Sequence, residues 1–452
     1  MMSDVSRTPS KAFNLLNNTD LKFGTVKDET GSDVTLSTGS FVVLMNSQDR
    51  NVRKKAFEQF HEGYKSHENT LSALLAGSIQ KDVFYAKARK FPSALESALF
   101  YEEVPKTVYD NLIKTVNAAL PVLYRYYELR RKKMNLDTLN MYDVYIPILS
   151  EIKTNYTWEQ AVDTVCKAVS VFGTEYTETL RAGLTTQRWC DRYENQGKRS
   201  GAFSYGSFSA KPYILMNYKD SVIDGMFTLA HEGGHSMHSY YSAKHQPYVY
   251  YDYVTFVAEV ASTANEDLLS RYLLKEAKDK QMKAYLVNRQ IDSIRQTLFR
   301  QTMFAEFEQR THSEAEAGKA LTAKSLQEIY YSLLKQYFGP KFTVDEILAA
   351  ECLRVPHFYR GFYVYKYATG ISAALSLSKR ISEAAQKSEA QRVEGVTIPT
   401  EVQNYLKFLS GGSSATPLEL LRIAGVDMES PKPIEDAMKR FEELVDELET
   451  LL

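Results

Sequence analysis

The stretch Phe227–Ser242, FTLAHEGGHSMHSYYS, carries the pattern H-E-x-x-H within a helical run of sequence. His231 and His235 are four residues apart, so on a helix both imidazoles project from one face about one turn apart. Two imidazoles at that spacing can hold one zinc ion, and Glu232 lies about 100° around the helix, beside the metal and not on it. In this motif the glutamate takes a proton from the attacking water. The stretch therefore predicts a helix built around a catalytic zinc site.

The alternative is an accidental match on a helix whose histidines only pack. The chain has eight histidines in 452 residues, so composition alone rarely produces this pattern. Between the two histidines stand Gly233 and Gly234, each of which costs about 1 kcal/mol relative to alanine inside a helix. The pair predicts that another backbone, such as a second metal-bearing helix, approaches closely there. Tight helix packing without any functional role would explain the glycines equally well.

A catalytic zinc site needs a third protein ligand. His238 would lie about 10 Å along the helix from His231, so we expect it in the cleft or behind the ligands. Downstream, VTFVAEVASTANEDLLSRYLL places Glu259 in an apolar run, where a metal would compensate its buried charge. Glu266 and Asp267 are the rivals, in a more polar setting that suits orienting the ligand histidines. We favour Glu259 as the third ligand.

A third segment, VPHFYRGFYVYKYATG, contains one histidine and four tyrosines, all of which can donate hydrogen bonds. Amide hydrolysis passes through an oxyanion, which neutral O–H or N–H donors stabilise. The segment offers these candidates: His357, Tyr359, Tyr363, Tyr365 and Tyr367. Tyrosines that line a helix flank with their hydroxyls in water are an equally good explanation of the spacing.

Outside these segments, three- and four-residue apolar periodicity dominates and predicts a mainly α fold. The clearest helical stretches are Arg53–Leu74, Lys106–Lys133, Asp279–Gly318, Lys324–Phe338 and Pro433–Leu452. LKFGTV and VTLST flank a turn-rich DETGSD and predict a hairpin. GAFSYGSFS and KPYILMNY, just before the H-E-x-x-H helix, predict a short sheet.

Composition excludes several classes of partner. Lys plus Arg (55) nearly equal Asp plus Glu (56), which argues against nucleic acid or an anionic membrane as the main partner. Three cysteines without a CxxC pair favour a reducing compartment. The first residues lack an apolar signal segment and no run reaches the roughly 18 apolar residues of a membrane span. These features predict a cytoplasmic protein.

Four blocks in order resemble one known family: HEGGHSMHSYYS, QPYVYYDYVTFVAEVASTANE, HFYRGFYVYKYATGISAA and FLSGGSSATPLELLRIAGVDM. They are similar to the oligoendopeptidase F group of the M3 (thimet oligopeptidase-like) zinc metallopeptidases, and the resemblance runs from about Ala12 to the C-terminus. It implies one Zn²⁺ ion bound by His231, His235 and Glu259, with Glu232 as the general base. It further implies that His357 and a tyrosine contact the oxyanion and substrate, with Tyr365 the first choice and Tyr363 the second.

The resemblance also implies a fold. It predicts a two-walled helical structure with a deep cleft that admits short unstructured peptides, and a small β-sheet beside the active-site helix. The strand KPYILMNY would pair with substrate backbone as an added strand. Family members usually carry a longer N-terminal helical portion, so we expect an N-terminally truncated arrangement. Residues 1–75 would be the remnant of that region, and residues 76–452 the M3-type catalytic domain.

The predicted function is a zinc-dependent endopeptidase that hydrolyses internal bonds of oligopeptides. A zinc carboxypeptidase of the same architecture is one alternative, and it would need a cation such as Arg354 or Arg360 for the substrate carboxylate. A peptide-binding protein that does not hydrolyse its ligand is another, although it would have no need for Glu232. Oligomeric state and cleavage preference are left open by the sequence.

Overall fold

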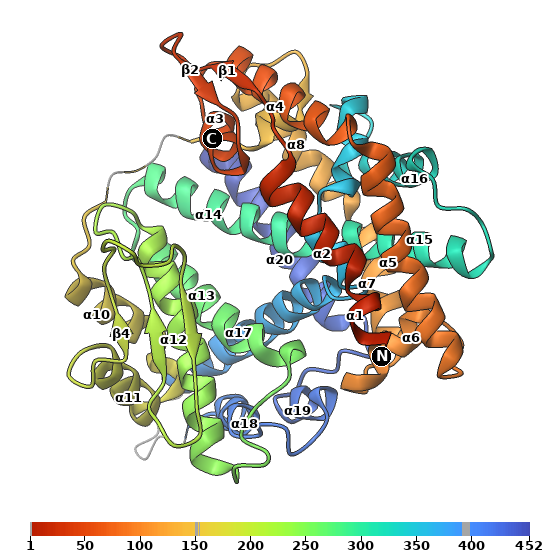
Figure 1. The fold of residues 1–452 in the computed structure, drawn as a ribbon. Coiled ribbons are helices and arrows are strands. Elements are labelled where there is room, and N and C mark those ends of the chain that lie inside the picture. Colours follow the sequence, from red (N-terminus) through yellow and green to blue (C-terminus); the bar gives the residue numbers. More distant parts are fainter. Residues whose placement is uncertain (1, 150–151, 153, 391–397) are drawn as a thin grey trace. The chain divides into compact units, whose positions relative to one another are not determined.

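Helices make up most of the chain, which confirms the predicted mainly α fold (Figure 1). The structure is a computed structural model that describes residues 2–149, 152, 154–390 and 398–452. Within those residues no helix combines the length and apolar character needed to cross a membrane. The chain divides into two units, each assembled from three separate segments.

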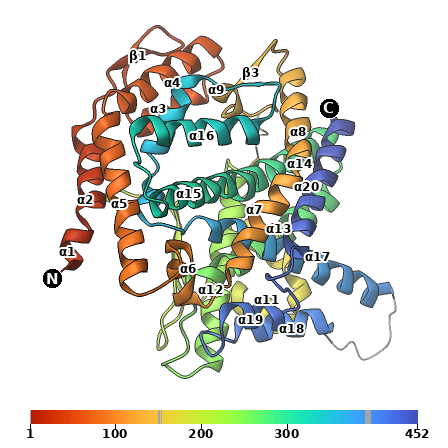
Figure 2. The same ribbon diagram turned by 90° about the vertical axis from the view of Figure 1, so that its right-hand side faces the viewer.

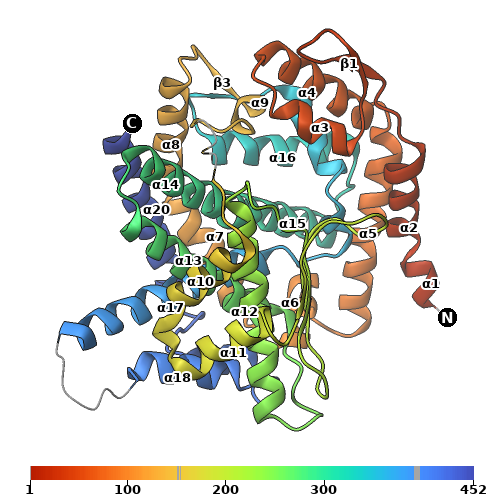
Figure 3. The same cartoon turned by 90° about the vertical axis from the view of Figure 1, so that its left-hand side faces the viewer.

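Unit 1 consists of Met1–Tyr101, Val116–Ser150 and Phe299–Tyr365. Its helices are α1 (Met2–Ser6), α2 (Thr8–Leu15), α3 (Thr38–Met45), α4 (Arg50–Lys65), α5 (Glu68–Ala88), α6 (Ala94–Leu99), α8 (Leu120–Lys133), α9 (Met141–Val144), α15 (Arg300–Glu316) and α16 (Ala323–Phe338). Short 3-10 turns cover Glu346–Leu353 and Pro356–Tyr359. Figure 3 shows α2 lying along α5, in agreement with their contacts.

Unit 2 consists of Glu102–Thr115, Glu151–Leu298 and Lys366–Leu452. Its helices are α7 (Lys106–Ala118), α10 (Trp158–Ala168), α11 (Thr174–Leu184), α12 (Asp224–His245), α13 (Thr255–Glu276), α14 (Lys280–Ile294), α17 (Tyr365–Ala390), α18 (Thr400–Leu409), α19 (Pro417–Ile423) and α20 (Lys432–Leu451). Figure 2 shows α14 beside α20, and α12 packs along α13 in the same unit.

The strands form three small sheets. β1 (Thr25–Lys27) and β2 (Asp33–Thr35) pair antiparallel with Val26 opposite Val34, which confirms the predicted hairpin. β3 (Leu139–Asn140) and β7 (Phe342–Thr343) form a parallel pair that was not predicted. In unit 2, β4 (Cys190–Asp191), β5 (Phe203–Tyr205) and β6 (Tyr213–Leu215) form a sheet in the order β4-β6-β5, which confirms the predicted β5-β6 pair and adds β4.

Three of the predicted helical stretches are interrupted. The first breaks at Ser66, whose hydroxyl bonds to the carbonyl of Gly63 at the end of α4. The second breaks at Ala119, because Pro121 opens a new helix and has no N–H to continue the old one. The third contains the π-helical turn Arg295–Phe299 between α14 and α15. Apolar periodicity survives such breaks, so it does not reveal them.

The predicted boundary at residue 75 falls inside a helix. α5 runs from Glu68 to Ala88 without interruption, and it lies wholly in unit 1. Leu71, Leu75 and Ile79 are buried along one face of this helix. The boundaries of the two units therefore differ from the predicted boundary between residues 1–75 and 76–452.

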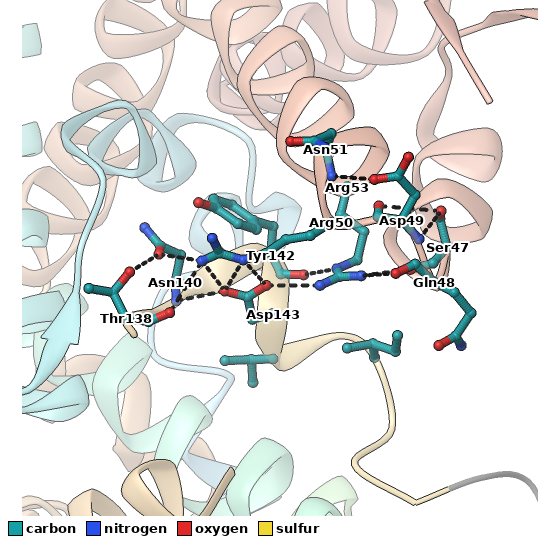
Figure 4. Close-up of polar contacts among 12 residues, drawn as sticks. Ser47, Gln48, Asp49, Arg50, Asn51, Arg53, Thr138, Asn140, Tyr142 and Asp143 are labelled. Carbon is teal, nitrogen blue, oxygen red and sulfur yellow. Dashed lines mark hydrogen bonds and ion pairs between the residues drawn. The ribbon is translucent and has the colours of Figure 1, made fainter. Parts of the chain in front are cut away.

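A buried carboxylate ties α4 to the segment around α9 (Figure 4). Asp143 is fully buried and accepts hydrogen bonds from Arg50 Nη2 at 2.8 Å and Arg53 Nη2 at 2.9 Å. Its Oδ2 also accepts the backbone N–H of Asn140 at 3.1 Å. Charge-assisted bonds of this kind are stronger than neutral ones. The cluster joins residues 90 positions apart in the chain.

A second buried carboxylate in unit 1 is Glu351. It pairs with Arg300 and with Arg354, the latter at 2.6 Å, and accepts the Tyr330 hydroxyl at 2.7 Å. Burial opposes ionisation of Glu351, but the two guanidinium groups outweigh it and hold its pKa below the ordinary value. Arg354 is thus engaged with Glu351 inside unit 1.

Candidate metal centre

α12 and α13 bring three metal-ligating side chains together. His231 Nε2 lies 3.2 Å from His235 Nε2. Glu259 Oε2, from α13, lies 3.4 Å from the first of these nitrogens and 3.5 Å from the second. Among the described residues, these three form the group whose donor atoms could share one metal ion.

The donor set fits a small tetrahedral cation. Ligands about 2.0–2.1 Å from zinc at tetrahedral angles are separated from one another by about 3.3 Å. The three observed separations, 3.2, 3.4 and 3.5 Å, match that edge length. Two histidines and a carboxylate are also a donor set used by catalytic zinc sites that keep a fourth position open.

The electrostatics of the centre favour positive charge. Burial opposes protonation of His231, but hydrogen bonds to Glu259 and Glu266 outweigh it and raise the pKa of His231 to about 10. Burial likewise opposes ionisation of Glu259, but His231 and His235 outweigh it and lower the pKa of its carboxyl. The carboxylates that stabilise the protonated form of His231 would also stabilise a bound metal cation.

Glu266 fixes the orientation of one imidazole. His231 Nδ1 donates to Glu266 Oε1 at 2.7 Å, which leaves Nε2 directed at the other donors. Such a carboxylate partner sets the tautomer and raises the basicity of a ligating histidine. Asp267, the neighbouring candidate, instead accepts hydrogen bonds from Gln290, Arg271 and Ser378 and so anchors α13 to α14 and α17.

Glu232 is buried beside the donors, with 5% of its surface exposed. Its Oε2 atom has no hydrogen-bond partner among the described residues. Burial raises the pKa of this carboxyl, and the nearby His231 and His235 oppose the shift. A buried polar atom without a partner is costly, so this oxygen can accept a hydrogen bond from a group outside the chain, such as water.

The two glycines of the motif have different neighbours. A Cβ at Gly234 would lie 2.6 Å from both Ala261 O and Ser262 Cα, so the backbone of α13 occupies its place. A Cβ at Gly233 would meet only the end of the Leu180 side chain, whose Cδ1 lies at 3.3 Å. The predicted close approach of another backbone is therefore confirmed at Gly234, and it brings Glu259 of α13 to the histidines.

His238 lies inside the packing of α12. It is buried and stacks on the Tyr253 ring at 3.7 Å with an interplanar angle of 4°. Burial lowers the pKa of His238 to about 3, so the ring is neutral. Tyr253 in turn bonds to the Ser239 hydroxyl at 2.9 Å. His238 is therefore part of the aromatic packing around α12.

The strand predicted to pair with substrate backbone, within KPYILMNY, has no open edge in its sheet. β6, within KPYILMNY, is the central strand of its sheet and has both edges paired, so it cannot accept an added strand. The outer edge of β5 has no strand partner in the described part of the chain. Ser204 of β5 bonds to Ser236 of α12 at 2.8 Å, directly after His235. Of β5 and β6, only β5 leaves one edge without a strand partner among the described residues.

The predicted oxyanion residues belong to unit 1, whereas the metal ligands belong to unit 2. His357 is exposed, and its ring lies 6.2 Å from the half-buried Tyr363 at an interplanar angle of 14°. Partial burial and the charge of Arg360 lower the pKa of His357. Tyr365 is 0% exposed. The structure thus brings His357 and Tyr363 together and buries Tyr365.

Comparison with known proteins defines the family. The model of peptidase family M3 matches residues 43–440, so the chain belongs to this family. The oligopeptidase PepF of Bacillus subtilis is 45% identical over 450 residues, covering 100% of this chain and 65% of that protein. An oligoendopeptidase F homolog of Borreliella burgdorferi is also 45% identical, over 97% of this chain and 71% of its own length.

A solved structure extends the likeness to the fold. The crystal structure of oligoendopeptidase-F from Enterococcus faecium superimposes with a TM-score of 0.81 at 36% identity, covering 100% of this chain and 73% of that one. The chain thus spans about two thirds to three quarters of the length of these relatives. Its membership of the M3 family agrees with the resemblance seen in the four sequence blocks.

Proposed function

We propose that this protein is a zinc-dependent endopeptidase that cleaves internal bonds of short, unstructured oligopeptides. The observation that carries the proposal is the buried Glu232, which keeps an unpartnered carboxylate oxygen beside three donors spaced for one metal ion. A purely structural metal site has no use for such an oxygen. The names of the M3 relatives support the same class of substrate.

The proposed ligands of zinc are His231, His235 and Glu259, whose separations suit tetrahedral coordination with one open position. A zinc ion bound there would polarise a peptide carbonyl and lower the pKa of water at the open position. Glu266 holds His231 with Nε2 free for this role.

Glu232 is the proposed general base. Its Oε2 would accept the proton from the attacking water and later deliver it to the nitrogen of the leaving amine. Burial keeps bulk water from competing for this oxygen. A single carboxylate oxygen can therefore serve both proton transfers in turn.

His357 and a tyrosine are the proposed donors to the oxyanion. The pKa of His357 is lowered, so its ring is neutral at pH 7 and can donate an N–H. We prefer Tyr363 to Tyr365 because Tyr363 is only half-buried and lies beside His357, whereas Tyr365 is fully buried. This reverses the order expected from the resemblance.

Substrate backbone would pair with the outer edge of β5. Main-chain hydrogen bonds to an edge strand give affinity that depends little on side chains. Phe203 and Tyr205 are exposed on this strand and would contact alternate substrate residues. The reducing, cytoplasmic location expected from the cysteines is part of the proposal, and cell fractionation would test it.

The test is cleavage mapping on two internally quenched peptides of one sequence, one with both ends blocked and one with a free carboxylate. An endopeptidase cuts both at the same internal bond and loses activity with a zinc chelator. Cleavage of the free-ended peptide alone, one residue from its C-terminus, would identify a carboxypeptidase. Stoichiometric zinc and peptide binding without cleavage would identify a binding protein and refute the proposal.

A further inference from the structure

The segment that carries His357 and Tyr363 contains a strained residue. Phe362 adopts φ of +57°, in the left-handed region. Four other non-glycine residues in the described part of the chain have positive φ, and all are polar and exposed or half-buried: Lys90, Glu103, Asn135 and Arg188. Phe362 alone among them is buried and apolar. This conformation costs a bulky residue about 1–2 kcal/mol, so the surroundings must hold it.

A buried carboxyl group holds the backbone of Phe362. Glu308, on α15, is 2% exposed, and its Oε1 accepts the Phe362 N–H at 2.9 Å. One turn further along the helix, the His312 ring packs on the Phe362 ring at 4.3 Å. α15 therefore contacts both the main chain and the side chain of the strained residue.

The preceding residue is held from a second helix. A Cβ at Gly361 would lie 2.6 Å from Asp82 Oδ2, on α5, so any larger residue there would displace that carboxylate. His312 Nε2 lies 3.5 Å from the same carboxylate oxygen and links the two helices. Gly361 and Phe362 are thus fixed between α5 and α15, all within unit 1.

We infer that Glu308 is a positioning residue that fixes the turn at Phe362 and thereby holds His357 and Tyr363 in register with each other. The two candidate donors lie on either side of the turn, so their 6.2 Å ring separation depends on its backbone. Arg360, between them, lies over the Tyr363 ring at 4.1 Å and shares the same dependence. The inference rests on the proposed function for the roles of His357 and Tyr363.

The properties of Glu308 suit a hydrogen-bond acceptor for the Phe362 backbone better than a partner in an ion pair. Within the described residues no cation pairs with Glu308, and burial raises the pKa of its carboxyl well above the ordinary value. A neutral carboxyl group still accepts a hydrogen bond through its carbonyl oxygen. Glutamine offers the same acceptor at the same distance from the backbone, whereas leucine fills the space and offers none.

The test compares Glu308→Gln and Glu308→Leu with Glu306→Leu. Glu306 is a buried glutamate on the same helix that bonds to Tyr337 and Asn117 and does not contact the turn. Since a misplacement of about 1 Å can cost about 100-fold in rate, we expect Glu308→Leu to lower kcat about 10- to 100-fold at unchanged metal content. KM should change much less, Glu308→Gln should retain activity, and Glu306→Leu should lose stability but keep kcat.

Amide hydrogen exchange of residues 357–364 tests the anchor without relying on catalysis. The segment should exchange slowly in wild type, Glu308→Gln and Glu306→Leu, and quickly in Glu308→Leu. Equal exchange in wild type and Glu308→Leu would overturn the inference, as would an unchanged kcat. If Glu308→Leu does not fold, Gly361→Ala, which presses a methyl group against Asp82, should give the same exchange and kcat losses. An inactive wild type with the expected exchange pattern would refute the proposed function alone.

Discussion

Replacing Gly234 with alanine should push α13 away from α12, whereas the same change at Gly233 should not. The new methyl group at Gly234 would stand 2.6 Å from backbone atoms of Ala261 and Ser262, which cannot rotate aside. At Gly233 the nearest atom is the end of the Leu180 side chain at 3.3 Å, which can. The two variants are therefore matched in chemistry and differ in what the methyl group meets.

The size of the effect follows from this difference. Each alanine gains about 1 kcal/mol of helix preference over glycine, and that gain cancels when the variants are compared. Overpacking a well-packed site costs about 1–3 kcal/mol. We therefore expect Gly234→Ala to be less stable than Gly233→Ala by about 1–3 kcal/mol. A shift of α13 by a few tenths of an ångström also exceeds the tolerance of about 0.2 Å for a metal ligand, so zinc affinity should fall.

Two assays separate these consequences. Thermal unfolding of the metal-free proteins reports the packing cost, at about 2–4 °C per kcal/mol for a unit of this size. Competition with a chromogenic chelator reports zinc affinity. If the two variants unfold at the same temperature and bind zinc equally well, the close approach at Gly234 does not position Glu259, and our reasoning about the glycines fails.

Three further predictions concern single carboxylates. Glu266→Gln should weaken zinc binding about 10- to 100-fold in a chelator competition, because it disturbs the partner that orients His231; Glu276→Gln, an exposed change on the same helix, should have no effect. Asp143→Ala should lower the free energy of unfolding by about 3–5 kcal/mol in denaturant titrations, since it leaves the buried Arg53 uncompensated; a loss below 1 kcal/mol would contradict this. Glu351 has a depressed pKa, so its contribution to stability is complete above its unfolded pKa of about 4.3 and is lost as pH falls below it. Acid titrations of unfolding should therefore show a shallower decline below that pH in Glu351→Gln than in wild type.

Local sequence patterns were enough to predict the hairpin and the helical regions, but not the breaks within those regions. The H-E-x-x-H spacing places two imidazoles on one face of α12, and Glu259 stands out as a charge in an apolar run. Gly234 signalled the close approach of α13 because glycine is costly in a helix unless space requires it. Each of these inferences depends on residues that are neighbours along one element.

Features that depend on tertiary pairing were not predictable in the same way. KPYILMNY reads as a strand, but only the pairing with β4 makes it the central strand and leaves β5 at the edge. Nothing in the local sequence links Arg53 to Asp143, which are brought together across the fold of unit 1. Glu308 also gave no signal, because an acidic residue in a helix is usually solvated, and its role depends on a backbone N–H that is 54 residues away.

The most direct test of the proposed mechanism is the turnover of an end-blocked peptide by Glu232→Gln at a zinc content equal to that of wild type. No residue that the structure describes hydrogen-bonds to Glu232 Oε2, so the amide should preserve the fold and the metal while removing the base. We expect full zinc stoichiometry with a loss of about 100- to 10,000-fold in kcat, the range typical of general base catalysis. Wild-type turnover in the zinc-loaded variant would show that Glu232 is not the base and would contradict the account.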